Sequence, residues 1–118
     1  LMMVDSMEMS KTERNYIIQK CIEEPVQQIV ITHGTDTMVE TARMLADPGI
    51  DKTIVLTGAM IPVKFGSSDG LFNMGSALSF VQALPPGVYI AMNGQIFNQE
   101  NVKKNNKLGI FEELELTL

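Results

Sequence analysis

Three short apolar runs rich in β-branched residues constrain the fold of this chain most strongly. They cover residues 26–32, 53–57 and 88–92, and segments with helical spacing lie between them at about 37–46 and 69–84. Each helical segment ends in a cluster of Pro and Gly, which breaks a helix. Such alternation predicts parallel strands joined by right-handed crossovers. We expect an α/β fold, a three-layer and mostly parallel flavodoxin-like sheet with helices on both faces.

The first 25 residues predict one more strand and one more helix. Residues 1–4 are apolar and are expected to form a fourth strand. Residues 10–13 read Ser-Lys-Thr-Glu, which matches a capping box, and apolar residues then recur at helical spacing until Pro25. We therefore expect a helix between this capping box and Pro25.

The composition excludes several classes of function. A length of 118 residues allows one domain, residues 1–118, and 45% hydrophobic against 19% charged residues is typical of a globular protein. A net charge of −5 argues against nucleic acid and anionic membranes as partners, because both require a basic surface. Neither a signal peptide nor an 18-residue apolar span is found.

Cys21 is the only cysteine, which excludes an internal disulfide and a cysteine-rich metal site. Its position one helical turn after Ile17 predicts a small buried side chain rather than a nucleophile. No metal-binding cluster or glycine-rich phosphate loop is found, so we expect neither a metal nor another cofactor. The default compartment is a reducing cytoplasm, although the chain starts at Leu1 and a preceding targeting segment would not be visible.

Polar residues follow each predicted strand and should converge at one edge of the sheet, because parallel strands share their carboxyl edge. Together they supply hydroxyls, carboxylates and one amine: Ser6, Thr35, Asp36, residues 58–60, residues 67–69 and Lys104. A threonine hydroxyl needs a base beside it to attack, and a lysine can serve as that base. Asp36 could bind an α-amino group, and the amides at two helix starts could bind a carboxylate or an oxyanion. An amino acid zwitterion fits this set.

Each of these residues also has a purely structural interpretation. Thr35 or Asp36 could cap the helix that follows, since both residue types are common N-caps. Gly34 could serve a sharp turn or the close approach of a ligand. Lys104 lies in a lysine-rich stretch that could be solvated, and His33 at the end of a buried strand is better explained as a hydrogen-bonded structural histidine than as a base.

Three motifs in order resemble the bacterial-type L-asparaginase family. Residues 32–38 read Thr-His-Gly-Thr-Asp-Thr-Met, residues 55–62 read Val-Leu-Thr-Gly-Ala-Met-Ile-Pro, and residues 68–73 contain Ser-Asp-Gly and Phe-Asn. The resemblance runs from about Ser6 to Lys104, and an ordered match of three motifs is far more specific than any one of them.

The resemblance implies a role for several residues. Thr35, Asp36 and Lys104 would form the catalytic threonine, aspartate and lysine triad, and Asp36 would also bind the amino group of the substrate. Ser6, Gly34 and Ala59 would bind the substrate, Ser6 at its α-carboxylate and Ala59 beside the amide through its backbone. Two positions depart from the family pattern, Met7 where Gln is common and Lys103 where Thr is usual.

The resemblance also implies segments that this chain does not contain. The second catalytic threonine of the family, the nucleophile, lies on an N-terminal strand, so we expect a truncated domain that lacks its first central strand, with about 30 to 45 residues missing. The C-terminal domain of the family is expected to be absent as well. A sheet interrupted in this way would expose unpaired backbone, and a homodimer or higher homo-oligomer is expected. The isolated chain is expected to show little or no turnover.

Three hypotheses about function follow. The first is an asparaginase-type amidohydrolase that hydrolyses L-asparagine or a related amide through a threonine acyl-enzyme. The second is a catalytically silent domain that binds a small amino acid or dicarboxylic acid. The third is a structural flavodoxin-like module, in which Thr35→Ala would cost about 1 kcal/mol and change no ligand affinity.

Overall fold

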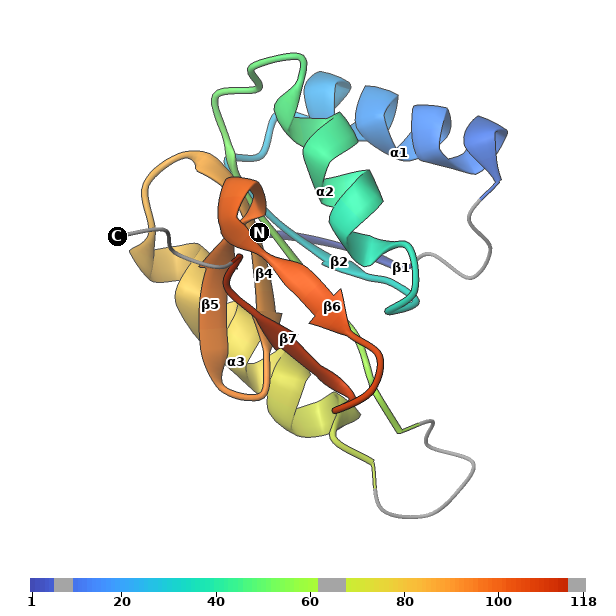
Figure 1. Cartoon of the computed structure of the whole chain (residues 1–118). Helices are drawn as coiled ribbons and strands as arrows, with labels where there is room; N and C mark the ends of the chain where they lie inside the picture. Colours follow the sequence, from blue (N-terminus) through green and yellow to red (C-terminus); the bar gives the residue numbers. More distant parts are fainter. Residues whose placement is uncertain (6–9, 62–67, 115–118) are drawn as a thin grey trace.

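A five-stranded sheet forms the centre of the fold (Figure 1). The computed structural model describes residues 1–5, 10–61 and 68–114. The strands lie in chain order across the sheet: β1 (Met2–Asp5), β2 (Gln28–Thr32), β3 (Thr53–Thr57), β4 (Gly87–Met92) and β5 (Gln95–Asn98). β1 to β4 are parallel and β5 is antiparallel to β4. The predicted mostly parallel α/β sheet is confirmed.

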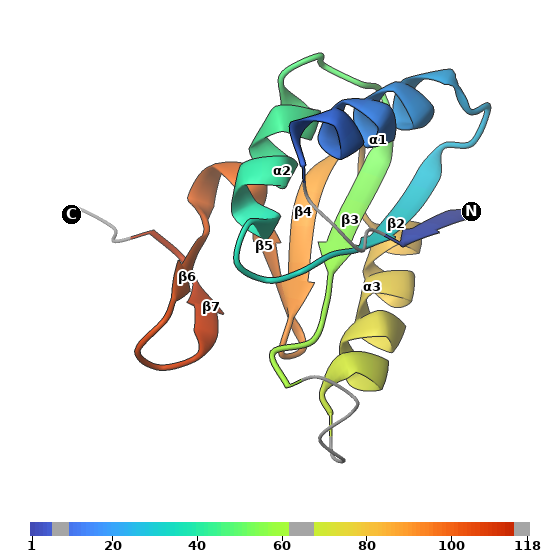
Figure 2. The same cartoon turned by 90° about the vertical axis from the view of Figure 1, so that its right-hand side faces the viewer.

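Helices cover both faces of this sheet, as expected. α1 (Lys11–Glu23) and α2 (Met38–Ala46) pack on one face, and α3 (Gly70–Ala83) packs on the other (Figure 2). Successive strand residues point to opposite faces, so Ile29 and Ile31 lie in the core beneath α1 and α2 while Val30 lies in the core beneath α3. The apolar strand runs are continuous because both faces of these strands are buried.

Both ends of α1 have specific partners. The Ser10 hydroxyl accepts a hydrogen bond from the Glu13 amide at 3.1 Å, as the predicted capping box requires. At the other end, the nearly buried Lys52 donates from Nζ to the carbonyls of Cys21 at 2.5 Å and Glu24. The ammonium thereby satisfies carbonyls that have no partner within the helix. Nothing in the spacing of the sequence indicates this role of Lys52.

Cys21 is buried and free, in agreement with its interpretation as an apolar core residue. Burial raises the pKa of its thiol to about 11, so that the reactive thiolate is scarce at neutral pH. Within residues 1–5, 10–61 and 68–114, no helix has the length and hydropathy needed to cross a membrane, and no three His, Cys, Asp or Glu side chains gather as a metal site would require.

β1 and β2 leave no unpaired backbone edge between them. β1 pairs directly with β2, from Met2 opposite Ile29 to Asp5 opposite Thr32. The backbone groups along the facing edges of β1 and β2 hydrogen-bond to each other, because unpaired backbone groups inside a fold are costly. The expected exposure of unpaired backbone is therefore wrong between β1 and β2, whereas the lack of the family's first central strand stays a prediction.

Residues 93–104 contain a turn, a strand and a short helix, and do not form the single loop at the carboxyl edge that would follow from treating Val88 to Met92 as the last strand. Asn93 and Gly94 have φ values of 57° and 76° and turn the chain tightly from β4 into β5. A short 3-10 helix, η2 (Gln99–Asn101), then leads into a separate two-stranded sheet of β6 (Lys103–Asn105) and β7 (Ile110–Glu112). Asn-Gly between two apolar runs is a strong hairpin signal, so the sequence did contain the evidence for β5.

Candidate active site

The loops that follow β2 and β3 lie against each other at the carboxyl edge of the sheet. The His33 amide donates to the Thr57 carbonyl at 2.9 Å, which continues the pairing of the two strands beyond Thr32. A Cβ on Gly58 would lie only 2.2 Å from the His33 carbonyl oxygen. Gly58 therefore permits the two loops to approach, and the sequence analysis had not identified this requirement.

Gly34 does not have the turn geometry that the sequence suggested. Its φ is not positive, and a Cβ at this position would meet nothing within 4 Å. The backbone at Gly34 therefore does not require glycine, neither for a left-handed conformation nor for close packing. The open space beside the exposed Gly34 leaves room for a ligand to approach its backbone.

Thr35, Asp36 and Lys104 meet at this edge although Lys104 is almost 70 residues away in sequence. The Lys104 ammonium donates from Nζ to Thr35 Oγ1 at 2.9 Å and to Asp36 Oδ1 at 2.6 Å. The side chain of Lys104 is 15% exposed and that of Asp36 is 89% exposed. The hydrogen bond and positive charge of Lys104 lower the pKa of the Asp36 carboxyl below its usual range.

Two structural interpretations of these residues are contradicted. α2 begins at Met38, its N-cap is Thr37, and no side chain accepts a capping hydrogen bond there. Neither Thr35 nor Asp36 therefore serves as the cap of α2. Lys104 is not a solvated lysine, because its side chain is mostly buried and its ammonium contacts two specific partners.

A groove of about 500 Å³ runs beside the Asp36 and Lys104 pair. Its walls come from the β2–α2 loop, α2 and the β6 region, and they are lined by Asp36, Val39, Arg43, Val102, Lys103, Lys104, Asn106 and Leu114. The volume lies within the range of pockets that hold small molecules. Cationic and anionic groups face the same space, so the groove is suited to a small zwitterion.

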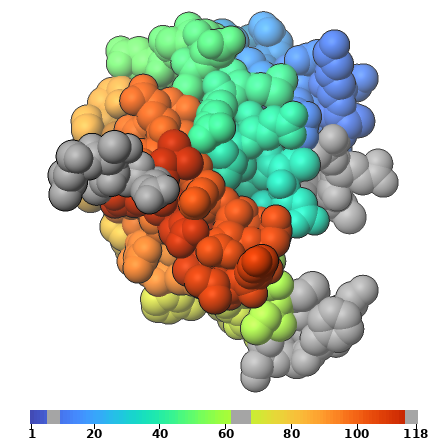
Figure 3. Space-filling view, in the orientation of Figure 1, coloured from blue at the N-terminus to red at the C-terminus, as the bar shows by residue number. Residues whose placement is uncertain are grey.

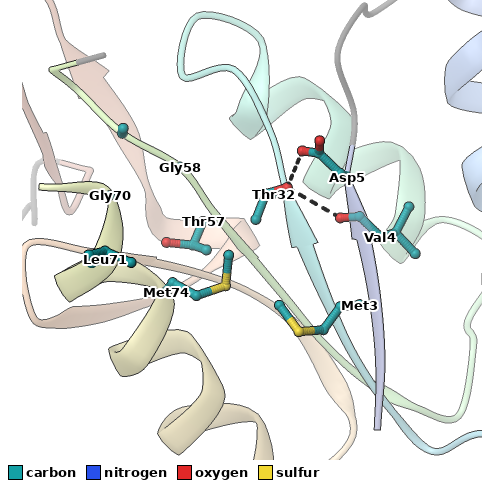
Figure 4. A pocket seen from close by; sticks show the side chains of 10 residues that line it. Met3, Val4, Asp5, Thr32, Thr57, Gly58, Gly70, Leu71 and Met74 are labelled. Atoms are coloured by element: carbon teal, nitrogen blue, oxygen red, sulfur yellow. Dashed lines mark hydrogen bonds between the residues drawn. The ribbon is translucent and has the colours of Figure 1, made fainter. Parts of the chain in front are cut away.

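Ala59 lies at a different hollow, of about 480 Å³, which has mostly apolar walls. Figure 4 shows this hollow between the ends of β1, β2 and β3 and the start of α3, with Met3 and Met74 lining it from two sides. Ala59 is not among the residues that line the groove of Asp36 and Lys104, although the loop that carries it contacts the β2–α2 loop through Gly58. Ser6 and Met7 lie outside the described residues.

The loop that carries Ala59 is held by Asp69 and Asn73. The Asp69 carboxylate accepts the amides of Met60 and Ile61, each at 3.1 Å, and Asn73 Nδ2 donates to the Gly58 carbonyl at 2.8 Å. Burial disfavours the Asp69 carboxylate, but these amide hydrogen bonds outweigh it and lower the pKa. Asp69 therefore holds this loop, a role that its Ser-Asp-Gly motif alone had not revealed.

His33 is a structural histidine, as the sequence analysis favoured. Its Nδ1 faces the Gly34 carbonyl at 2.5 Å and its Nε2 faces Thr41 Oγ1 at 2.9 Å. A carbonyl can only accept, so Nδ1 carries the proton and Nε2 accepts from the Thr41 hydroxyl, which in turn accepts from Arg14 Nε at 3.2 Å. Burial lowers the pKa of His33, and the positive charge of Arg14 contributes in the same direction.

The lowered pKa of His33 predicts a specific pH dependence. In the unfolded chain the imidazole takes up a proton near pH 6.5, whereas in the folded chain it stays neutral to lower pH. The contribution of neutral His33 to the free energy of unfolding is therefore fully present above about pH 6.5. This contribution is lost as the pH falls towards the pKa of His33 in the folded chain. His33→Asn should reduce the loss of unfolding free energy between pH 7.5 and 5.5, measured by urea denaturation. An imidazole NMR titration at or above the ordinary value would contradict this, and the chain has only one histidine to observe.

The fold and this edge define a parallel α/β domain with a hydroxyl, a carboxylate and an ammonium in contact at the carboxyl ends of its strands. The sequence profile described as Asparaginase, N-terminal matches residues 1–112. The chain belongs to this family.

Individual relatives agree with this assignment. The L-asparaginase of Thermococcus kodakarensis is 40% identical over 86 residues, 70% of this chain and 26% of that protein. The glutaminase-asparaginase of Acinetobacter glutaminasificans is 41% identical over 92 residues, 74% of this chain and 28% of that protein. The chain thus spans about a quarter of the length of these relatives.

Solved structures show the same fold. The thermostable L-asparaginase from Thermococcus kodakarensis superposes with a TM-score of 0.77 and 28% identity, covering 92% of this chain and 35% of that one. L-asparaginase I from Vibrio cholerae superposes with a TM-score of 0.78 and 26% identity, covering 93% of this chain and 35% of that one. The α/β sheet described above is therefore similar to part of the sheet in these asparaginase structures.

Proposed function

We propose that this domain supplies Thr35, Asp36 and Lys104 to the active site of an asparaginase-type amidohydrolase. The reaction would hydrolyse L-asparagine or a related amide to the amino acid and ammonia through threonine-based acyl-enzyme chemistry. The observation that supports it best is the contact of one ammonium, on Lys104, with both Thr35 Oγ1 at 2.9 Å and Asp36 Oδ1 at 2.6 Å. The names of two relatives, an L-asparaginase and a glutaminase-asparaginase, support hydrolysis of an amide as the reaction.

Each of the three side chains would have its own role in the reaction. The Thr35 hydroxyl accepts from Lys104, so its own proton is free to point towards a substrate or a water molecule. Thr35 and Lys104 would together relay a proton or activate a water molecule, and the attacking hydroxyl of the acyl-enzyme step would come from the second catalytic threonine of the family. Asp36 is ionised and exposed, which suits it to bind the α-amino group of an amino acid.

We propose the remaining substrate contacts from the family resemblance. Ser6 would bind the α-carboxylate, the exposed backbone of Gly34 would lie beside the substrate, and Ala59 would contact the amide through its backbone. In this proposal the chemistry needs neither a metal nor another cofactor, since the three side chains supply the hydroxyl, the proton acceptor and the charge.

The context of the domain is part of the same proposal. We expect residues 1–118 to form one α/β domain, to act in the cytoplasm and to associate as a homodimer or larger homo-oligomer. The exposed apolar side chains of Met3, Leu71 and Phe72 are consistent with association. The buried free thiol of Cys21 is consistent with a reducing compartment.

Calorimetric titration and an ammonia assay test the proposal together. L-asparagine and its product L-aspartate should bind to the 118-residue chain, and Thr35→Val or Asp36→Asn should weaken that binding. Ammonia release from L-asparagine and L-glutamine is measured on the chain and on any longer form of the protein that contains it. Binding without ammonia release in the longer form would favour the alternative, a silent binding domain. The absence of both would contradict the two functions.

A further inference from the structure

Lys104 lies on a hairpin that is separate from the main sheet. Among the described strands, β6 and β7 pair only with each other. Val102 and Phe111 attach this hairpin to the core, where both are almost fully buried. Apolar contacts of this kind are not directional, so they hold the hairpin against the core without specifying where a side chain on β6 points.

Arg43 supplies a directional link between the hairpin and α2. Its Nε donates to the Gln99 carbonyl at 3.4 Å and its Nη2 donates to the Val102 carbonyl at 3.2 Å. One planar guanidinium therefore contacts both ends of the segment 99–102, which leads from η2 into β6. Val102, at the end of this segment, lies two residues before Lys104. Figure 3 shows the surfaces of α2 and of this segment in contact. The rigid fork of arginine fixes direction in a way that a lysine cannot.

We propose that Arg43 is the positioning residue of Lys104. By binding the carbonyls of Gln99 and Val102 it sets the start of β6 relative to α2, so that the ammonium of Lys104 reaches both Thr35 and Asp36. The importance of this role for catalysis rests on the proposed function, but the placement of Lys104 does not.

Arg43 also lines the groove beside Asp36, which offers a competing explanation. Its positive charge could act on Asp36 directly through space, without any effect on Lys104. The two explanations differ in what happens once Lys104 is removed. A positioning residue then has nothing left to position, whereas a direct charge effect persists.

The experiment measures the pKa of the Asp36 carboxyl by carbon NMR in the 118-residue chain and in three variants. Arg43→Lys keeps the charge and loses the fork, Lys104→Met removes the ammonium, and the third variant combines both changes. We expect the Asp36 pKa to rise in Arg43→Lys towards its value in Lys104→Met. We expect the double variant to titrate like Lys104→Met alone, because coupled residues are not additive.

Two results would overturn the proposal. One is an Asp36 pKa in Arg43→Lys equal to that of the parent, with the amide spectrum showing an intact fold. The other is that Arg43→Lys raises the Asp36 pKa equally in the parent and in Lys104→Met. This result would show that Arg43 acts directly on Asp36. Arg43 is exposed, so lysine fits there. Arg43→Met provides a second variant for the same comparison.

Lys107→Met is the matched control, because it removes a positive charge from the same hairpin. Lys107 is exposed and lies outside the groove, so the Asp36 pKa should stay at the parent value. The titration also separates this inference from the proposed function. If the protein binds no amino acid, the Asp36 pKa still reports whether Arg43 positions Lys104. If amino acids bind and Arg43→Lys leaves the Asp36 pKa unchanged, only the positioning role is lost.

Discussion

In a longer form of the protein that releases ammonia, replacing Lys104 with methionine is expected to lower ammonia release from L-asparagine by about 10²- to 10⁴-fold, the usual contribution of a positioned acid or base. Methionine keeps most of the buried length of the side chain but removes the ammonium that donates to Thr35 and Asp36. Thr35 Oγ1 then loses the hydrogen bond that it accepts from Lys104. The Asp36 pKa should rise to its usual range, because Lys104 is the cause of its decrease.

The change should affect stability much less than turnover. Asp36 is highly exposed, and ion pairs with exposed partners contribute little to folding. Urea denaturation checks this, and Lys107→Met serves as the charge-matched control for turnover. Parent-like ammonia release by Lys104→Met would exclude Lys104 from the chemistry, whereas an unfolded variant would be recognised from its amide spectrum.

Gly58→Ala is expected to destabilise the fold by about 3 kcal/mol, at the upper end of what overpacking costs. The new Cβ would lie 2.2 Å from the His33 carbonyl oxygen and 3.1 Å from Met38 Cε. The methionine end can move, but the carbonyl belongs to the backbone, whose neighbouring amide pairs with Thr57. The β2–α2 and β3–α3 loops must therefore separate.

Chemical denaturation of the variant measures this cost. Gly34→Ala is the matched control at the same edge, because its Cβ would meet nothing within 4 Å and its φ is not positive. It should change the unfolding free energy by no more than about 0.5 kcal/mol. Equal stabilities for Gly58→Ala and Gly34→Ala would show that the close approach of the two loops does not exist in solution.

Local patterns predicted the elements that carry the site. Helical and strand periodicity located α1 to α3 and β1 to β4, because each element buries one or both faces and so must repeat its apolar residues. Ser10 was identified as the N-cap of α1 from its spacing to Glu13, since a cap depends on neighbours within one turn. The Asn93 and Gly94 turn was equally local but was not recognised.

Other features depend on residues that are distant in sequence. Lys52 satisfies the end of α1 across about 30 residues, and no pattern around Lys52 distinguishes it from an exposed lysine. Gly58 is required because the His33 carbonyl lies against it, which only the pairing of β2 with β3 brings about. β1 likewise pairs directly with β2 because the backbone groups on their facing edges need hydrogen-bond partners. The composition of the chain does not reveal this pairing.

The sequence by itself determined the class of fold, the edge at which polar residues gather, and the family. It could do so because periodicity, helix stops and ordered motifs are local features that the linear sequence shows directly. Only the tertiary structure decided that the Lys104 ammonium contacts Thr35 and Asp36 while Ala59 lines a separate hollow. The reason is that hydrogen bonds act over about 3 Å. Whether two side chains come that close depends on the path of the chain through β5, η2 and β6, and the spacing of residues in the sequence does not show this path.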